Sequence, residues 1–258
     1  MILKLKPSLK SAVWGGQRLR NEYGKICDLP NIAESWELSC HSAGMTSVED
    51  GGTLTELIAA NPGILGDGCE KMPLIVKLID ACDDLSVQVH PTAEYAAAHP
   101  GAESKNEMWY VLDCSPGAYI IRGFREDMTR ERVRAAIAEG TLLDKVNRIP
   151  VKKGDVFYIP AGTVHALGKG CLVAEVQQDS ATTFRIYDYG RGRQLHINEA
   201  LEVLELGAAP VPGQIPGDVL LDCGCFRVCR ADISGESETI QNCGSFTHVM
   251  IEEGGGEI

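Results

Sequence analysis

The sequence predicts a mainly β fold, either a sandwich or a barrel, with a few short helices inserted between the strands. Short apolar runs of β type recur along the chain, and Gly, Pro, Asp and Asn separate them. This punctuation is typical of sandwiches and barrels and disfavours alternating strand–helix units. With 258 residues, the chain can bury a substantial core in one large domain or two small ones.

The elements follow in chain order. Strands are expected at PLIVKLID, LSVQVH, MWYVLD, AYIIR, VFYIP, CLVAEVQ and TTFRIYD. A helix is expected at TLTELIAA, which starts with a capping box between Thr53 and Glu56. A second is expected at TRERVRAAIAEG, where Thr129 is the N-cap and Gly140 the stop signal. A third begins at Asn198 in NEALEVLEL.

The stretch GAAPVPGQIPG, residues 207–217, is rich in Pro and Gly and indicates a linker. It would divide the chain into a domain over residues 1–206 and a smaller β unit over residues 218–258. Within the smaller unit, DVLLD, CFRVCR and SFTHVMIEE favour strands. The chain stops at Ile258, soon after a glycine turn, so we expect an incomplete unit with an unpaired strand edge.

The charge balance narrows the class of partner. A formal net charge of −12 disfavours nucleic acid or an anionic membrane, and an anionic substrate would need a local group of Arg or Lys. No apolar run approaches the ~18 residues of a membrane span. The start, MILKLKPSLK, lacks the features of a signal peptide. We therefore expect a cytoplasmic protein that acts on a small molecule, and nothing in the sequence specifies an oligomeric state.

The ten cysteines include no C-x-x-C pair, and the chain is longer than the small secreted domains that depend on disulfides. Reduced thiols are therefore expected. Cys223, Cys225 and Cys229 could bind a metal, but three thiols on one strand face are poorly placed to surround an ion. Packing is the favoured interpretation of these three residues.

The stretch GDVFYIPAGTVHALG, residues 154–168, carries the first chemical signal. Pro160 fixes φ where the first strand ends, and Gly162 permits a tight turn. The segment is expected to be a hairpin that directs His165 across the sheet. A histidine in that position has a function only if other ligand-type side chains converge on it.

Two further strands supply such side chains. Gln88 and His90 are two residues apart, so a strand places both on one face. Lys105 and Glu107 repeat this spacing just before an apolar strand. A carboxylate inside a barrel is costly unless it is paired or bound to a metal. Gln88, His90, Glu107 and His165 form a set of N and O ligands that suits zinc and is also compatible with iron, manganese or nickel.

Several segments, in this order, resemble type I phosphomannose isomerases in their compact microbial form, a family of the cupin superfamily. The segments are SAVWGG, ESWELS, LIVKLIDACDDLSVQVHP, KNEMWYVL, GDVFYIPAGTVHAL and TTFRIYDYGR. The resemblance covers about residues 5 to 206. It implies a cupin (jelly-roll) barrel with helical insertions, followed by a partial second cupin-like β unit.

The resemblance also implies roles for single residues. It implies one zinc ion per chain, bound by Gln88, His90, Glu107 and His165. Lys105 and Arg185 would be the catalytic and substrate-binding residues. The chain departs from the family pattern at Ser104, where at least the longer members commonly have His, and at Ala181, where the compact members often have Asp.

The implied reaction interconverts mannose 6-phosphate and fructose 6-phosphate through an enediol. Zinc would act as a Lewis acid. A dication beside Lys105 would favour its neutral form, which can act as a base. Arg185 could hold the enediolate or the phosphate through its fork of donors, and Arg191 and Arg193 are looser phosphate candidates. His41 is a further candidate for the lining of the pocket.

Two other functions compete with this interpretation. A non-catalytic cupin could bind a sugar or regulate another protein, but the complete ligand set with Lys105 and Arg185 argues against it. A metal-dependent cupin oxygenase would be expected to have a His-x-His pair, whereas Gln88 occupies the position of the first histidine. An isomerase assay would exclude the first alternative, and metal analysis would exclude the second.

Overall fold

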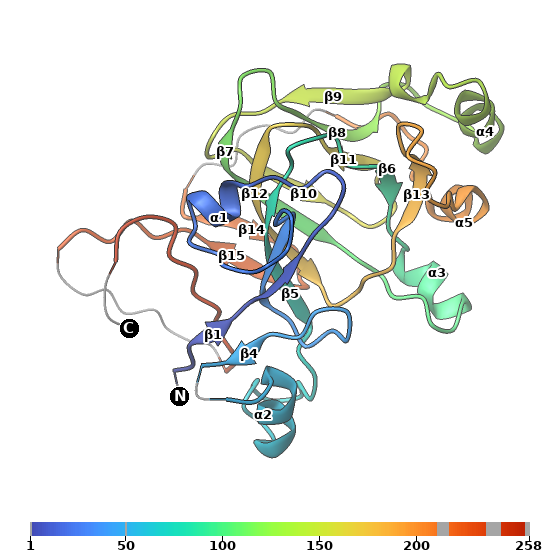
Figure 1. Ribbon diagram of the computed structural model, residues 1–258. Helices are drawn as coiled ribbons and strands as arrows, with labels where there is room; N and C mark the ends of the chain where they lie inside the picture. The colour runs from blue at the N-terminus through green and yellow to red at the C-terminus, as the bar shows by residue number, and fades with distance from the viewer. Residues whose placement is uncertain (1, 50, 211–216, 236–243, 256–258) are drawn as a thin grey trace.

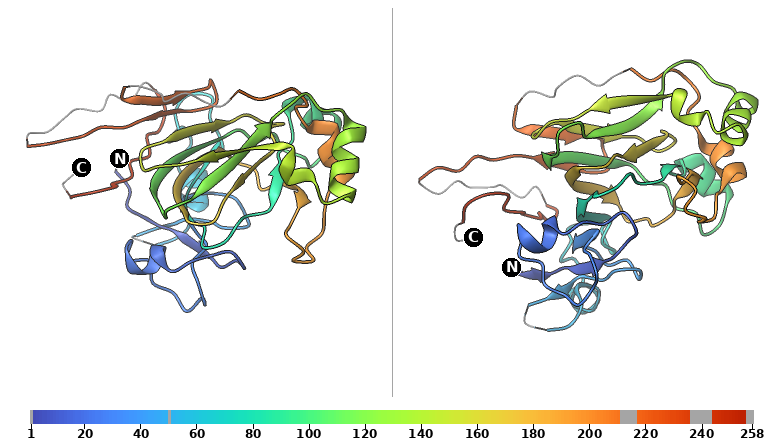
Figure 2. Two further views of the ribbon diagram at one scale, coloured as in Figure 1. Left: turned by 90° about the horizontal axis from the view of Figure 1, so that it is seen from above. Right: turned by 45° about the horizontal axis from the view of Figure 1, so that its top comes forward.

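Two antiparallel sheets face each other and enclose the interior of a barrel (Figures 1 and 2). The structure, a computed structural model, describes residues 2–49, 51–210, 217–235 and 244–255. One sheet has six strands in the order β10 (Val156–Ile159), β7 (Glu107–Cys114), β12 (Cys171–Gln178), β5 (Leu74–Asp80), β3 (Glu34–Leu38) and β2 (Ser8–Lys10). The other has five in the order β13 (Phe184–Tyr187), β6 (Val87–Val89), β11 (His165–Leu167), β8 (Tyr119–Phe124) and β9 (Val146–Pro150). The mainly β prediction is confirmed.

The helices are short and lie outside the barrel (Figure 1). They are α1 (Arg18–Asn21), α2 (Leu54–Ala60), α3 (Ala93–Ala98), α4 (Arg130–Ala138), α5 (Ile197–Val203) and the 3₁₀ turn η1 (Leu142–Asp144). The predicted capping box of α2 is present, because Thr53 and Glu56 each accept a backbone N–H of the other. Thr129 caps α4 as predicted. No helix among the described residues is long and apolar enough to cross a membrane.

Period-two alternation decides which residues enter the interior. Val87 and Val89 are fully buried on the outer face of β6, in a cluster with Val133 of α4 and Leu201 of α5. Gln88, between the two valines, therefore faces the interior. Residues of both sheets, such as Trp109 and Leu167, form the apolar part of the interior. The helices α4 and α5 thus cover one sheet from outside and leave its inner face to the site.

The segment around Pro160 is not the expected hairpin. Strand β10 pairs with β7, whereas β11 pairs with β6 and β8, so the chain crosses from one sheet to the other between Ile159 and His165. Gly162 adopts a φ of +83°, and a Cβ there would lie 2.8 Å from the carbonyl oxygen of Val203. The crossing turn, rather than a paired hairpin, places His165 inside the barrel.

Residues 219–229 lie against the outer face of the six-stranded sheet. Strands β14 (Val219–Asp222) and β15 (Arg227–Cys229) pair with each other, and Leu220 and Phe226 pack into a cluster with Met108. Two smaller strands, β1 (Leu5–Lys6) and β4 (Ser47–Val48), pair near the N-terminus. The division of the chain at residues 207–217 stays a prediction.

Two details of this region differ from expectation or lie outside the described residues. The strand predicted at 245–253 is absent, because residues 244–255 make a single bridge, from Ser245 to Gly66, and no ladder. Of the expected linker, residues 211–216 lie outside the described residues. Its first part is fixed to the barrel, since Ala209 donates to the carbonyl of Phe124. The expected end of the second unit, residues 256–258, also lies outside the described residues.

Candidate metal centre and active site

Three ligand-type side chains from three different strands converge inside the barrel. His90 directly follows β6, Glu107 begins β7 and His165 begins β11. Their ligating atoms all lie within 4.8 Å of one another. The distances to the Glu107 carboxylate are 3.1 Å from His90 Nε2 and 3.5 Å from His165 Nε2. Each residue is at most 1% exposed, so the group is shielded from bulk water.

Backbone carbonyls fix the orientation of both imidazoles. His90 Nδ1 lies 3.0 Å from the carbonyl oxygen of Thr182, and His165 Nδ1 lies 2.8 Å from that of Thr163. A carbonyl only accepts hydrogen bonds, so in the neutral rings Nδ1 carries the proton. Each Nε2 then presents a lone pair toward Glu107. This is the arrangement in which a metal-binding histidine is held by its other nitrogen.

The cluster contains two buried atoms that no hydrogen bond among the described residues satisfies. Among the described residues, His90 Nε2 and Glu107 Oε2 are buried without a hydrogen-bond partner. A lone pair at His90 Nε2 and a carboxylate oxygen 3.1 Å away repel each other unless a proton or a metal ion lies between them. A metal ion would satisfy both atoms, so the donor set fits one.

Burial and neighbouring charge set the protonation states. Burial lowers the pKa of His90 to about 3 and also lowers the pKa of His165. Burial opposes ionisation of Glu107, but the Lys105 ammonium overrides it and the pKa of this carboxyl stays well below its usual range. Two neutral imidazoles and one carboxylate are therefore present at neutral pH, which are the forms that bind metals.

Gln88 lies beside the cluster. It is opposite His165 on β11 and opposite Arg185 on β13, so the three side chains form a row on the inner face. Gln88 Nε2 is 3.4 Å from His165 Nε2. The amide nitrogen faces the histidine, so a metal contact through the amide oxygen would require the amide to turn over.

Lys105 is buried next to Glu107. Its Nζ lies 2.8 Å from Glu107 Oε1 and donates to Gln177 Oε1 at 3.3 Å. A buried ammonium requires such partners. The structure thus brings Lys105 to the three ligand-type residues, as the spacing of Lys105 and Glu107 in the sequence suggested.

Arg185 reaches the same face from β13. Its Nη1 donates to the carbonyl oxygen of Gln194 at 2.9 Å, which anchors one edge of the guanidinium. Its Nε is buried and has no hydrogen-bond partner among the described residues. This N–H is therefore available to an acceptor other than the described residues.

Arg191 and Arg193, the further phosphate candidates, form ion pairs with carboxylates. Arg191 Nη2 pairs with Asp83 at 2.6 Å, and Arg193 pairs with Asp188. Both guanidiniums therefore already have carboxylate partners. His41 lies near Trp36, with 6.3 Å between the ring centroids. The described cysteines are free thiols and do not join a group of metal ligands. Cys223 packs against an apolar cluster, but Cys225 and Cys229 are exposed, so the packing interpretation is wrong for those two.

A second layer of buried charge was missed by sequence reasoning. Lys77 Nζ lies 3.0 Å from Glu175 Oε1, and Glu175 Oε2 accepts from Trp109 Nε1 at 2.8 Å. The Trp109 ring contacts the ring of His165 edge-on, with 5.6 Å between centroids. The signal was available: a lysine inside PLIVKLID and a glutamate inside CLVAEVQ interrupt otherwise apolar strands.

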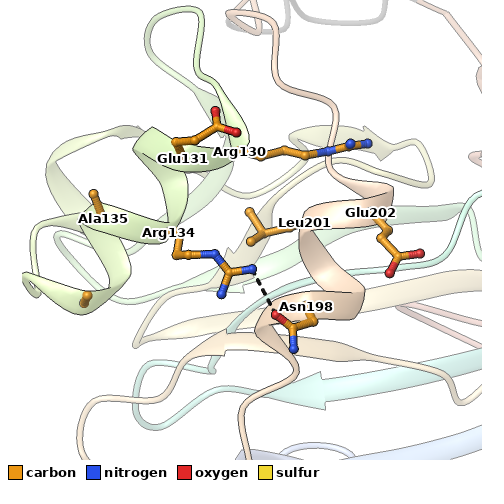
Figure 3. A pocket seen from close by; sticks show the side chains of 8 residues that line it. Arg130, Glu131, Arg134, Ala135, Asn198, Leu201 and Glu202 are labelled. Carbon is orange, nitrogen blue, oxygen red and sulfur yellow. Dashed lines mark hydrogen bonds between the residues drawn. The ribbon is translucent and has the colours of Figure 1, made fainter.

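A separate groove lies between α4 and α5 and has a volume of about 650 Å³ (Figure 3). Arg134 donates to Asn198 across it at 2.9 Å. Because both helices pack on the outer face of the five-stranded sheet, this groove and the His–Glu–His cluster lie on opposite sides of that sheet.

The fold and the cluster define a cupin barrel with a candidate metal centre in its interior. The family model described as phosphomannose isomerase type I, catalytic domain, matches residues 2–116. The mannose-6-phosphate isomerase of Streptococcus mutans is 38% identical over 99% of this chain and 86% of the relative. The mannose-6-phosphate isomerase ManA of Bacillus subtilis is 36% identical over 99% of this chain and 87% of the relative.

Solved structures give the same relation. The crystal structure of the mannose 6-phosphate isomerase from Bacillus subtilis superposes with a TM-score of 0.77 and 34% identity, over 86% of this chain and 74% of that chain. The structure of a putative mannosephosphate isomerase from Archaeoglobus fulgidus superposes with a TM-score of 0.67 and 26% identity, over 80% of this chain and 68% of that chain. The chain belongs to the type I phosphomannose isomerase family, so the cupin prediction is confirmed.

Proposed function

We propose that this chain interconverts mannose 6-phosphate and fructose 6-phosphate with one zinc ion held by Gln88, His90, Glu107 and His165. The observation that carries the proposal is the geometry of the cluster, in which two Nε2 lone pairs and a carboxylate face one point. Relatives named mannose-6-phosphate isomerase align over nearly the whole chain. Family and cluster together therefore support a metal-dependent sugar-phosphate isomerase.

The donor set favours zinc among the metals. Two imidazoles and one carboxylate are ligands typical of catalytic zinc sites, which leave a further position for water or substrate. When bound, zinc would supply Lewis-acid polarisation of a sugar oxygen. With Gln88 as a neutral fourth ligand, the site would carry a net charge near +1.

The reaction requires a proton to move between C1 and C2 of the sugar through an enediol. In our proposal the neutral amine of Lys105 takes this proton from one carbon, becomes an ammonium and returns the proton to the other carbon, because its Nζ is buried 2.8 Å from Glu107 Oε1 and thus beside the proposed ligands. Gln177 and Glu107 restrict the ammonium to one position. The low exposure of the residues around it would keep bulk water from the transferred proton.

The reaction also requires a donor for negative charge. Arg185 is proposed for this role, because its Nε has no partner in the described part of the chain while Nη1 is anchored to Gln194. A guanidinium fixed at one edge can offer its remaining N–H groups to the enediolate or the phosphate. The anchored edge fixes the direction in which these N–H groups point.

The test is an assay of the purified full chain before and after metal removal. We expect the metal-free protein to be inactive in a coupled assay that detects fructose 6-phosphate formed from mannose 6-phosphate. Added zinc should restore turnover at one ion per chain. A zinc-loaded, folded protein without turnover would instead favour a non-catalytic cupin. A purified protein that contains a redox metal and consumes oxygen would favour an oxygenase.

A further inference from the structure

Gln177 is a buried amide whose orientation is fixed by its neighbours. It ends the inward-facing row of β12, opposite Glu107, and is 0% exposed. Its Nε2 donates to two carbonyl oxygens, those of Gln178 at 3.0 Å and Ser180 at 2.8 Å. Both amide hydrogens are therefore used, and Oε1 must face the other way, toward Lys105 Nζ at 3.3 Å.

The turn held by the amide nitrogen leads to His90. The Ser180 hydroxyl donates to the carbonyl oxygen of Glu103 and accepts from the backbone N–H of Thr182, both at 3.2 Å. The carbonyl oxygen of Thr182 in turn accepts the Nδ1 proton of His90 at 3.0 Å. The position of that carbonyl determines which way His90 Nε2 points.

We propose that Gln177 is a positioning residue of the metal centre, which holds Lys105 through its oxygen and, through its NH₂ group, the turn that orients His90. This inference rests on the proposed metal-binding role of the His90, Glu107 and His165 cluster. Gln177 touches neither metal nor substrate in this role. The oxygen of its rigid amide positions Lys105, and the nitrogen positions His90 through the turn.

A purely structural role makes a different prediction. If Gln177 served only to satisfy the carbonyls of Gln178 and Ser180, its loss would lower stability as any buried substitution on β12 does. A matched control is Val173→Ala, on the same strand and the same face but in the apolar cluster. If the role of Gln177 were purely structural, a substitution of Gln177 and Val173→Ala should leave the protein with similar zinc affinities.

The principal experiment compares Gln177→Met, which keeps the side-chain length, with Val173→Ala and the wild-type chain. Zinc affinity is measured by competition with a chromophoric chelator. We expect zinc binding to weaken by about 10- to 100-fold in Gln177→Met and by less than about twofold in Val173→Ala. For the isomerase reaction, kcat should fall by about the same factor while KM stays within about twofold. A folded Gln177→Met variant with wild-type zinc affinity would overturn the inference.

A measurement on the metal-free protein separates this inference from the proposed function. In wild-type protein, ¹⁵N NMR of the imidazoles should show His90 as the Nδ1–H tautomer, and Gln177→Met should show loss of that tautomer. The measurement needs neither zinc nor substrate. An unchanged His90 signal in the variant contradicts the inference, whereas absence of turnover in the wild-type chain contradicts only the proposed function.

Ser180→Ala provides a second route, in case Gln177→Met does not fold. It removes one hydroxyl from the same turn and leaves every bond of Gln177 in place. We expect zinc affinity to fall severalfold, with the same change in the His90 signal but smaller. Wild-type affinity together with an unchanged signal in Ser180→Ala would show that the turn does not orient His90.

Discussion

The barrel interior has two ends that are built on the same strands but differ in chemistry. On β11, His165 and Leu167 share one face, and on β12 Gln177 and Val173 do so. The first of each pair belongs to the polar end, whereas Leu167 and Val173 lie in the apolar cluster. Because strands alternate with a period of two, a step of two or four residues along one face takes the chain from one end to the other.

The apolar end contributes stability to the fold, and the polar end contributes its chemistry. The apolar end removes large side chains such as Trp109 and Phe157 from water, which favours the folded state. The polar end buries Glu107 and Lys77, and desolvation of such groups is unfavourable. His90 Nε2 and Glu107 Oε2, which have no hydrogen-bond partner among residues that the structure describes, persist there because the apolar end stabilises the barrel. Substitutions at the polar end should therefore reduce metal binding and turnover, whereas substitutions at the apolar end should reduce the free energy of unfolding.

The largest effect is expected for His165→Ala, at the polar end. The change removes one proposed ligand, so the protein should lose its zinc. Turnover should fall by at least about 10³-fold, since a lost Lewis acid removes several kcal/mol of transition-state stabilisation. Metal analysis and the isomerase assay test this. A variant that retains one zinc per chain would show that His165 is not a ligand.

Leu167→Ala, two residues further along the same strand, should show the reverse. Leu167 is 1% exposed and lies in the apolar cluster, so the free energy of unfolding should fall by about 2–5 kcal/mol. Zinc content and turnover per folded molecule should remain near wild type. Urea denaturation and the assay on the same preparation measure both quantities. If turnover fell as far as in His165→Ala, the two ends would not be separable.

A smaller effect is expected for Arg185→Ala. Arg185 contributes an N–H that no described residue engages and one anchor to Gln194. Turnover should fall by about 10²-fold, the usual cost of losing a donor to developing negative charge. The free energy of unfolding should change by less than about 1 kcal/mol, because the side chain is half-buried and its anchor is one hydrogen bond. Near-normal turnover would remove Arg185 from the mechanism.

The sequence predicted the polar end better than the path of the chain around it. Gln88, His90, Glu107 and His165 could be found because strand period and a family resemblance both apply to them. The crossing between β10 and β11 could not be found, since two apolar runs around a Pro–Gly turn have the same local pattern whether they pair or change sheets.

Long-range partners limited the prediction in a second way. Lys77 and Glu175 are 98 positions apart, and only the pairing of β5 with β12 brings them together. The strand expected at 245–253 is wrong for a related reason, because its apolar residues have no ladder partner among the described residues. Local periodicity identifies a face, but the neighbouring strand decides what that face contacts.

The smallest effect is expected in the pH dependence of the free energy of unfolding. Burial lowers the pKa of His90 to about 3, against about 6.5 in an unfolded chain. Between these two values the unfolded chain binds a proton that the folded one does not, so the free energy of unfolding falls as pH falls through this window. The slope should approach about 1.4 kcal/mol per pH unit for each such histidine in the metal-free protein. Urea denaturation from pH 7.5 to 5.5 measures it. His90→Gln should reduce the slope, and Leu167→Ala should leave it unchanged. Equal slopes in the wild-type chain and both variants would show that acid does not act through the polar end.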